Sequence, residues 1–131
     1  MSFVMLASRL RRPSGAEANM TNDNLFPFQK LDAYTVAKEI ARRVHEARIQ
    51  DPELKDQADR ASKSCFLGLC EGLPNEAPGL RRRYFTQSRN SLHELVGAVD
   101  LAATLDAMKQ EDAEAIQSLA RRLKSMLRAL A

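Results

Sequence analysis

Two histidines are the residues of this chain best suited to acid–base or metal chemistry near neutral pH. In a helical bundle, a di-iron centre needs Glu-x-x-His pairs, because residues three apart place both ligands on one helix face. Arg42 stands three residues before His45, and Asn90 stands three residues before His93. The sequence also contains no Gly-rich phosphate loop and no Gly-x-Ser-x-Gly elbow. We therefore expect no metal, no cofactor and no enzymatic activity.

Cys65 and Cys70 are five residues apart within an apolar run. This spacing fits neither a Cys-x-x-Cys pair nor half of a zinc site. We expect both to behave as small buried hydrophobic residues, in a protein kept in the reducing cytoplasm. No apolar stretch approaches the roughly 20 residues that span a bilayer, so no membrane partner is expected.

One histidine lies in a near-match to a nuclease signature. The run Arg89-Asn90-Ser91-Leu92-His93 is similar to the Arg-Asn-x-x-x-His signature of the all-helical HEPN ribonucleases, but it is one residue too short. Arg89 and His93 still share a helix face, where an arginine could stabilise a phosphate beside a histidine acid or base. Because the spacing is broken, we favour an exposed helical pair over a ribonuclease site.

Basic residues form two stripes that could bind phosphate groups. The formal net charge of +3 is too small to identify a nucleic-acid-binding protein by itself. The placement of the cations is more informative, because they recur at helical spacing away from the apolar stripes. The expected nucleic-acid-binding residues are Arg82, Arg89, Arg121, Lys124 and Arg128. A plain solvated face is the alternative reading of either stripe alone.

Three further charged residues are expected to form structural pairs. Glu71 lies in the last turn of a predicted helix, where the helix dipole disfavours an anion. A nearby cation, Arg82 or Arg83, is therefore expected to pair with it across the following turn. Glu94 lies on the same side of its helix as Arg83 and is expected to pair in a similar way.

Four segments carry apolar residues at three- and four-residue spacing, and none alternates as a strand would. Proline and glycine separate the first three of them, and a polar turn over residues 106–112 precedes the last. The sequence thus predicts an all-α protein, an antiparallel up-down-up-down four-helix bundle. The predicted helices run from Lys30 to about Ile49, from about Pro52 to Gly72, from roughly Ala77 to Leu105, and from the end of the 106–112 turn to the C-terminus.

The third predicted helix is apolar over about half of its circumference, more than a surface helix needs. Its main stripe is expected to face the core and comprises Leu80, Tyr84, Ser88, Ser91, Leu95, Ala98 and Ala102. A second stripe, with a neighbour on the preceding helix, would remain partly in water in a monomer. We expect it to form a subunit interface of a cyclic homo-oligomer, through Phe85, Leu92, Val96 and Phe66. The alternative is that the second and third predicted helices are simply the more central pair of the bundle.

The 131 residues suffice for one domain. Residues 1–27 are irregular and rich in turn-forming residues, which predicts a disordered N-terminal tail. The bundle is expected to occupy residues 28–131. Met20 is as good a start as Met1.

Several motifs along the bundle resemble one known family. They are Phe28-x-x-Leu31-x-x-Tyr34-x-x-Ala37, Gln57-x-x-Arg60-Ala61-x-x-Ser64, Glu71-Gly72, and Tyr84-Phe85-x-x-Ser88-x-x-Ser91-Leu92-x-Glu94-Leu95. Together they resemble the four-helix-bundle proteins encoded within intervening sequences of bacterial large-subunit ribosomal RNA genes. The resemblance covers about residues 28–130. The chain departs from the family pattern at Gly68, where Asn is usual, at Ser88, where Ala is usual, and at Asn90, where Gly is usual.

The resemblance implies a cytoplasmic protein that assembles into a homopentameric ring. The wider family includes the accessory protein of diversity-generating retroelements, which works with a reverse transcriptase and nucleic acid. Our leading hypothesis is therefore a non-enzymatic, ring-forming adaptor whose basic helix faces bind RNA or DNA. The alternatives are a protein-only scaffold, an accessory subunit of a reverse transcriptase and, with less support, a HEPN-like ribonuclease.

Overall fold

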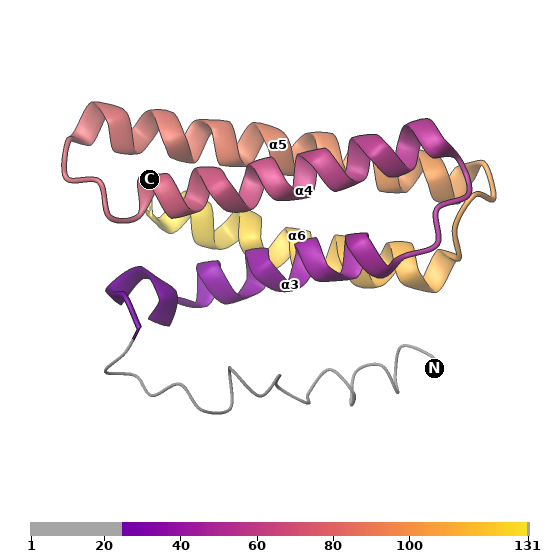
Figure 1. The fold of residues 1–131 in the computed structure, drawn as a ribbon, viewed down its shortest axis with the longest axis horizontal. Helices are drawn as coiled ribbons and strands as arrows, with labels where there is room; N and C mark the ends of the chain where they lie inside the picture. Colours follow the sequence, from indigo (N-terminus) through magenta and orange to yellow (C-terminus); the bar gives the residue numbers. More distant parts are fainter. Residues whose placement is uncertain (1–24, 131) are drawn as a thin grey trace.

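A computed structural model describes residues 25–130 of the chain, so the prediction for the N-terminal tail falls almost entirely outside the described residues. One short 3-10 helix, η2 (Pro27–Lys30), leads into four long helices (Figure 1). These are α3 (Asp32–Glu46), α4 (Pro52–Gly72), α5 (Pro78–Thr104) and α6 (Gln110–Leu130). The described residues include no strand, which confirms the predicted all-α class.

Consecutive helices run in opposite directions, joined by connections over residues 47–51, 73–77 and 105–109 (Figure 1). Each helix packs against its neighbours in sequence, and α6 closes the bundle by packing against α3. The most extensive contact joins α4 to α5. Both the start of α3 and the end of α6 therefore lie at the end of the bundle that carries the α4–α5 turn.

Two of the turns share one arrangement, in which a proline begins the next helix and a cation near it binds the carbonyl groups that end the previous helix. Pro52 and Pro78 open α4 and α5 at the first helical position, where a missing N–H costs nothing. Three residues later in each helix, a cation donates to the last carbonyl groups of the preceding helix. Lys55 Nζ lies 2.8 Å from Val44 O and 2.9 Å from His45 O. Arg81 Nη1 lies 2.7 Å from Leu73 O and 3.2 Å from Gly72 O.

The α4–α5 contact is close because small residues line it. Ser88, which is fully buried, donates a hydrogen bond of 2.8 Å to Cys65 O, and the Ser64 and Ser91 hydroxyls lie 2.9 Å apart. A Cβ atom added at Gly72 would lie 2.8 Å from the Phe85 ring, closer than atoms can pack. The main predicted stripe of α5 therefore faces α4 for much of its length.

The predicted orientation of α5 was wrong at three positions of that helix and needs correction. Leu80, expected in the core, is 43% exposed, whereas Phe85 and Leu92, expected to remain partly in water, are each 1% exposed. The buried arc of α5 is centred between the two apolar stripes rather than on the first. The fully buried core includes Ile40, Val44, Leu69, Phe85, Leu92, Leu95, Val99, Ile116, Leu123 and Leu127.

The other helix boundaries lie close to the predicted ones, and the first and last helices differ most. The first predicted helix began at Lys30 and ended near Ile49, but η2 occupies the beginning and α3 ends at Glu46. The last helix begins at Gln110, within the turn predicted over residues 106–112. Its preceding turn contains Asp106 in the left-handed region, at φ 60°, a conformation that aspartate tolerates better than most residues.

Candidate nucleic-acid interface

A simple rule of position identifies which residues line each outer face of the bundle. On α3 and α4, residues directly after a core residue lie on the face that these two helices share. Tyr34 follows buried Ala33, Phe66 follows buried Cys65, and their rings lie 5.2 Å apart. In the bundle, α5 lies diagonally across from α3 and runs in the same direction, and α6 lies diagonally across from α4 and runs in the same direction. Residues directly after a core residue of α5 or α6 therefore lie on the outer face that α5 and α6 share.

The rule brings the predicted binding residues of both stripes to the α5–α6 face. Arg89 follows buried Ser88, Arg121 follows Ala120, Lys124 follows Leu123 and Arg128 follows Leu127. Arg82 lies two helical turns before Arg89 on the same side of α5. We call these five residues the basic surface: Arg82, Arg89, Arg121, Lys124 and Arg128. Since α5 and α6 are antiparallel, the start of α5 and the end of α6 meet, so both stripes lie near one end of the bundle.

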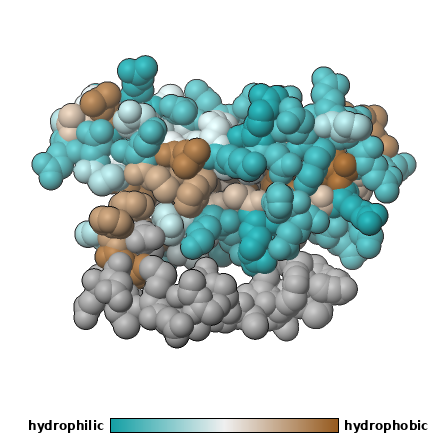
Figure 2. All heavy atoms as spheres, in the orientation of Figure 1, coloured by the Kyte–Doolittle hydropathy of each residue, from teal (hydrophilic) through white to brown (hydrophobic). Residues whose placement is uncertain are grey.

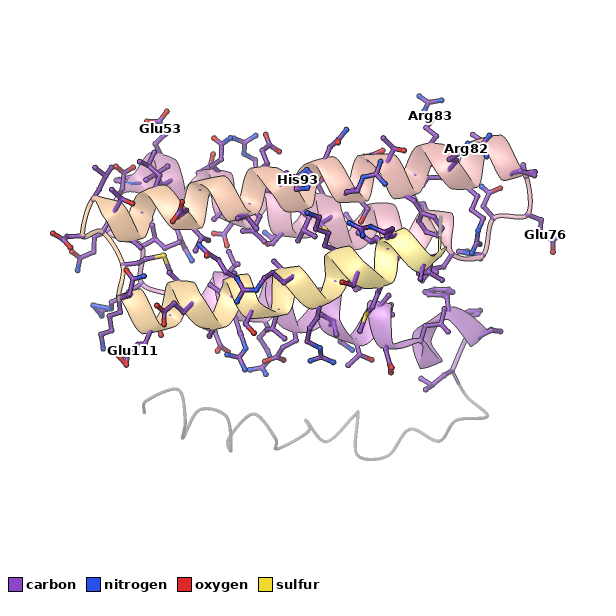
Figure 3. All side chains as sticks on the ribbon, turned by 180° about the vertical axis from the view of Figure 1, so that it is seen from behind. Glu53, Glu76, Arg82, Arg83, His93 and Glu111 are labelled. Atoms are coloured by element: carbon purple, nitrogen blue, oxygen red, sulfur yellow. The ribbon has the colours of Figure 1, made fainter. Side chains whose placement is uncertain are left out.

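Figure 3 views the bundle from the side on which α5 and α6 lie in front. Arg82 and Arg83 are close to the end that carries the α4–α5 turn, and His93 lies near the middle of α5. Glu111 and Glu53 lie at the opposite end. We refer to these ends as the basic end and the acidic end of the bundle.

The cations of the basic surface have no ion pair or side-chain hydrogen bond among the described residues. Four of its five members are exposed, and Arg89 is half-buried. Several cations elsewhere are paired within their own helices: Arg42 and Arg43 bind Glu39 at 2.7 and 2.9 Å, and Arg60 binds Asp56 at 3.1 Å. The positive charge of the basic surface is therefore available to an external anion.

The α5–α6 face changes sign along its length. Beyond half-buried Val96, the exposed residues that follow core positions are Asp100 on α5 and Glu114 on α6. The same antiparallel arrangement that gathers the cations also gathers these carboxylates, because the end of α5 meets the start of α6. The basic surface is thus bounded by a negatively charged region on the same face.

His93 and Arg89 do not form an organised catalytic site. His93 is exposed, and neither side chain has a hydrogen-bond or ion-pair partner within residues 25–130. Acid–base catalysis by histidine requires a group that orients the ring and a pocket that holds substrate. In the part of the chain that the structure describes, no group of three His, Cys, Asp or Glu side chains could hold a metal ion.

The predicted polar pairs are absent from the described part of the chain, and a different residue fixes the turn. Glu71, Glu94 and Arg83 are all exposed, and no ion pair joins any of them to a described residue. Arg81 takes the expected structural role instead: its guanidinium donates to the carbonyl groups of Gly72 and Leu73 at the end of α4 and lies 4.8 Å from the centre of the Phe85 ring. The Arg81 guanidinium supplies positive charge and hydrogen-bond donors directly to the carbonyl groups at the end of α4. The end of α4 is therefore stabilised without an ion pair between Glu71 and a cation.

The predicted subunit interface also needs correction. Phe85 and Leu92 are buried within the single chain, which removes them from any surface that a second copy could reach. Val96 and Phe66 are half-buried and remain partly accessible. Large side chains that are exposed instead comprise Phe26, Leu31, Leu67, Leu80, Leu101 and Leu105.

An aromatic row crosses the α3–α4 face, opposite the basic surface. Phe26 stacks on Phe28 at 6.0 Å, Phe28 meets Tyr34 edge to face at 5.7 Å, and Tyr34 contacts Phe66. Phe26 is 67% exposed. Figure 2 shows apolar surface gathered on this face of the molecule, on the side toward the basic end. Sequence reasoning identified only Phe66 of this row as a surface residue.

Neither cysteine is suited to thiol chemistry. Burial raises the pKa of the Cys65 thiol from its usual 9.0 to about 11, although a hydrogen bond with Ser88 partly opposes this effect. Partial burial also raises the pKa of the Cys70 thiol, and the negative charge of Glu71 adds to the increase. Both thiols therefore stay protonated and poorly nucleophilic near neutral pH.

No helix within residues 25–130 is long and apolar enough to cross a membrane.

Comparison with known proteins places the chain in a family. No curated protein matches it. The family described as 23S rRNA-intervening sequence protein matches residues 29–129, which include all four long helices. The match thus covers both the basic surface and the aromatic row apart from its first two members, Phe26 and Phe28. This chain belongs to the 23S rRNA-intervening sequence protein family.

Proposed function

We propose that this protein is a non-enzymatic, ring-forming adaptor that binds the phosphate backbone of nucleic acid through its basic surface. One observation carries the proposal: five cations from two helices lie together on one face and lack ionic partners in the described chain. Among residues 25–130, the anions on that face are Asp100 and Glu114, and both lie toward the opposite end of the bundle. The name of the family, which refers to sequences that interrupt 23S rRNA, is consistent with an RNA setting.

The strength of such binding follows from counting the phosphates that one chain can reach. Each neutralised phosphate releases condensed counterions, which gives a slope of about −0.9 per contact in a plot of log affinity against log salt. Five cations therefore predict a slope no steeper than about −4.5 for one chain. This is weak for a single copy, and a ring that repeats the surface would strengthen it by multivalency.

Ring formation requires an interface, and the accessible apolar residues supply one. Within the described residues, the aromatic row forms apolar surface on the α3–α4 face (Figure 2). A second copy is the occupant we propose, with a different face, carrying Leu80 and Leu101, packed against the row. Contact between two unlike faces is head-to-tail, and such contacts generate a closed ring when the rotation closes. A homopentamer is the expected product.

Fluorescence anisotropy with labelled RNA and DNA tests the binding proposal. The variant Arg89→Glu/Lys124→Glu removes the centre of the basic surface and should weaken binding at least about tenfold. A matched control is Arg48→Glu/Lys109→Glu, which changes the net charge equally at exposed positions near the acidic end. This control should change the affinity far less. If the unmutated protein binds neither RNA nor DNA at low salt, the proposal is wrong.

Two further measurements separate the alternatives. A protein-only scaffold, or an accessory subunit of a reverse transcriptase that contacts only protein, would retain its cellular partner after nuclease treatment and after the Arg89→Glu/Lys124→Glu change. A HEPN-like ribonuclease would cut RNA without added metal, and His93→Ala would abolish the cleavage. The adaptor proposal expects no cleavage above the background of that variant.

A further inference from the structure

The basic surface has a limited length along the helices. Arg82 and Arg89 are separated by seven residues, as are Arg121 and Arg128, which corresponds to about 10 Å at a rise of 1.5 Å per residue. Neighbouring helix axes lie about 8–10 Å apart, and the cationic side chains extend beyond both axes. The basic surface is therefore at least as wide across the two helices as it is long.

The boundary of the basic surface is unfavourable to phosphate. Asp100 is about 16 Å along α5 from Arg89 at the helical rise, and Glu114 is about 10 Å along α6 from Arg121. A nucleic acid that followed the groove between α5 and α6 would bring successive phosphates beside these carboxylates. At physiological salt the Debye length is about 8 Å, so charges at contact distance would repel without effective screening.

The basic surface also lacks groups on which bases could stack. Single-strand-binding surfaces combine cations with aromatic side chains on which the bases stack. Four aromatic side chains of the described residues, Phe26, Phe28, Tyr34 and Phe66, gather on the α3–α4 face instead. Phe85 is buried, half-buried Tyr84 lies against Gly72 of α4, and His93 is exposed on α5 near the cations. Rigid helices hold the cations in a fixed array, which suits a ligand whose phosphates are also fixed in place.

We infer that the basic surface takes the phosphate backbone of a double helix, and that the double helix crosses α5 and α6 instead of lying along the groove between them. This inference rests on the proposed function and adds the form and the path of the ligand. A duplex presents its phosphates already ordered, whereas a single strand would have to be ordered on a surface that offers no stacking in return. Recognition through the backbone alone is independent of base sequence.

Four labelled probes test the form of the ligand: an RNA duplex, a DNA duplex of the same sequence, and one single strand of each. At equal salt and length, both duplexes should bind at least about tenfold more tightly than the single strands, with little effect of base sequence. Single strands that bind as tightly as duplexes would overturn the inference while leaving the proposed function intact. The ratio of RNA-duplex to DNA-duplex affinity identifies which double helix the surface prefers. If none of the four probes binds, the proposed function itself fails.

Reversing the charges that bound the basic surface tests the path of the double helix across α5 and α6. The variant Asp100→Lys/Glu114→Lys extends positive charge along the groove, and Glu53→Lys/Glu111→Lys makes the same charge change at the acidic end outside the groove (Figure 3). A duplex that crosses the helices gains no contact, so both variants should give the same salt slope. A slope steeper by about 2 for Asp100→Lys/Glu114→Lys alone would show two added phosphate contacts and overturn the crossing path.

Discussion

At the scale of single residues, Gly68 and Ser88 lie against each other. A Cβ atom at Gly68 would lie 3.4 Å from Ser88 Cβ and 3.3 Å from Tyr84 O, so a large side chain at position 68 would force α4 and α5 apart. The Ser88 hydroxyl donates a hydrogen bond to Cys65 O. The absence of a side chain at Gly68 and the hydrogen bond of Ser88 thus belong to one close contact between α4 and α5.

Glycine-to-alanine changes measure how close that contact is. Gly97→Ala meets nothing within 4 Å and should stabilise the protein by about 1 kcal/mol, because alanine favours the helical backbone. Gly72→Ala would place its methyl group against Phe85 and should destabilise the protein by about 1–3 kcal/mol. Urea denaturation of both variants checks the opposite signs. Equal effects from the two changes would show that the helices separate easily.

The buried thiol of Cys65 predicts a loss of stability in alkaline solution. Its pKa is about 11 in the folded protein and 9.0 when the thiol is exposed, so the folded state disfavours the thiolate. The contribution of the protonated Cys65 thiol to the free energy of unfolding is therefore fully present below pH 9, declines as pH rises, and is lost above about pH 11. The difference corresponds to about 2–3 kcal/mol.

Comparison with Cys65→Ala isolates this effect from the titration of other groups. The difference in unfolding free energy between the unmutated protein and Cys65→Ala should shrink between pH 9 and 11, and Cys70→Ala should show a smaller pH dependence. A difference that stays constant over this range would contradict the assignment.

At the scale of the helices, the repeated pairing of an N-terminal proline with a cation three residues later organises two of the three turns. Arg81 and Lys55 each place a positive charge where the preceding helix presents its unsatisfied carbonyl groups. Arg81→Met keeps an apolar stem but removes these hydrogen bonds, and it should cost about 1–3 kcal/mol. Arg82→Met, one residue away and exposed, is the matched control and should leave the melting temperature nearly unchanged. A similar loss in both variants would mean that charge alone, and not the cap, stabilises the turn.

The sequence predicted the helices well because their signals are local. Pro52 and Pro78 mark helix starts by geometry alone, and apolar spacing identifies all four segments. The orientation of α5 could not be predicted in the same way. Its apolar residues cover two adjacent arcs, and the arc that turns inward depends on how closely α4 approaches through Gly68 and Gly72. That approach is a property of the pair of helices, so Leu80 and Phe85 were assigned to the wrong environments.

The candidate site shows the same limit at longer range. Periodicity identified a stripe that contains Arg82 and Arg89, and another that contains Arg121 and Arg128. Whether two stripes meet depends on which helices are neighbours and on the handedness of the bundle, and neither is a local property. The aromatic row was missed for a related reason, since Phe28 and Phe66 are distant in sequence and only the α3–α4 packing brings them into line with Tyr34.

At the scale of the whole molecule, the same substitution should have different consequences at a buried leucine and at an exposed leucine. Leu92→Glu would place a charge in the core, where the side chain is 1% exposed, and should unfold the chain or cost more than about 3 kcal/mol. Leu67→Glu, at a position 57% exposed, should leave the free energy of unfolding within about 0.5 kcal/mol.

Phe66→Glu supplies the corresponding test of assembly, because Phe66 belongs to the aromatic row that we propose a second copy covers. Light scattering after size exclusion should give a ring for the unmutated protein and a smaller species for Phe66→Glu with its helical content retained. A monomeric mass for the unmutated protein at micromolar concentration would exclude the ring.

An even number of antiparallel helices returns the chain to the end of the bundle where α3 began (Figure 1). The last described turn of α6 therefore lies at the basic end, in the same turn as Arg128. A chemical cross-linker or cleavage reagent tethered after Leu130 by a short linker would have a local concentration in the millimolar range beside the basic surface. An attachment point beside the last described turn of α6 would thus report on any ligand of the basic surface without altering a residue that binds it.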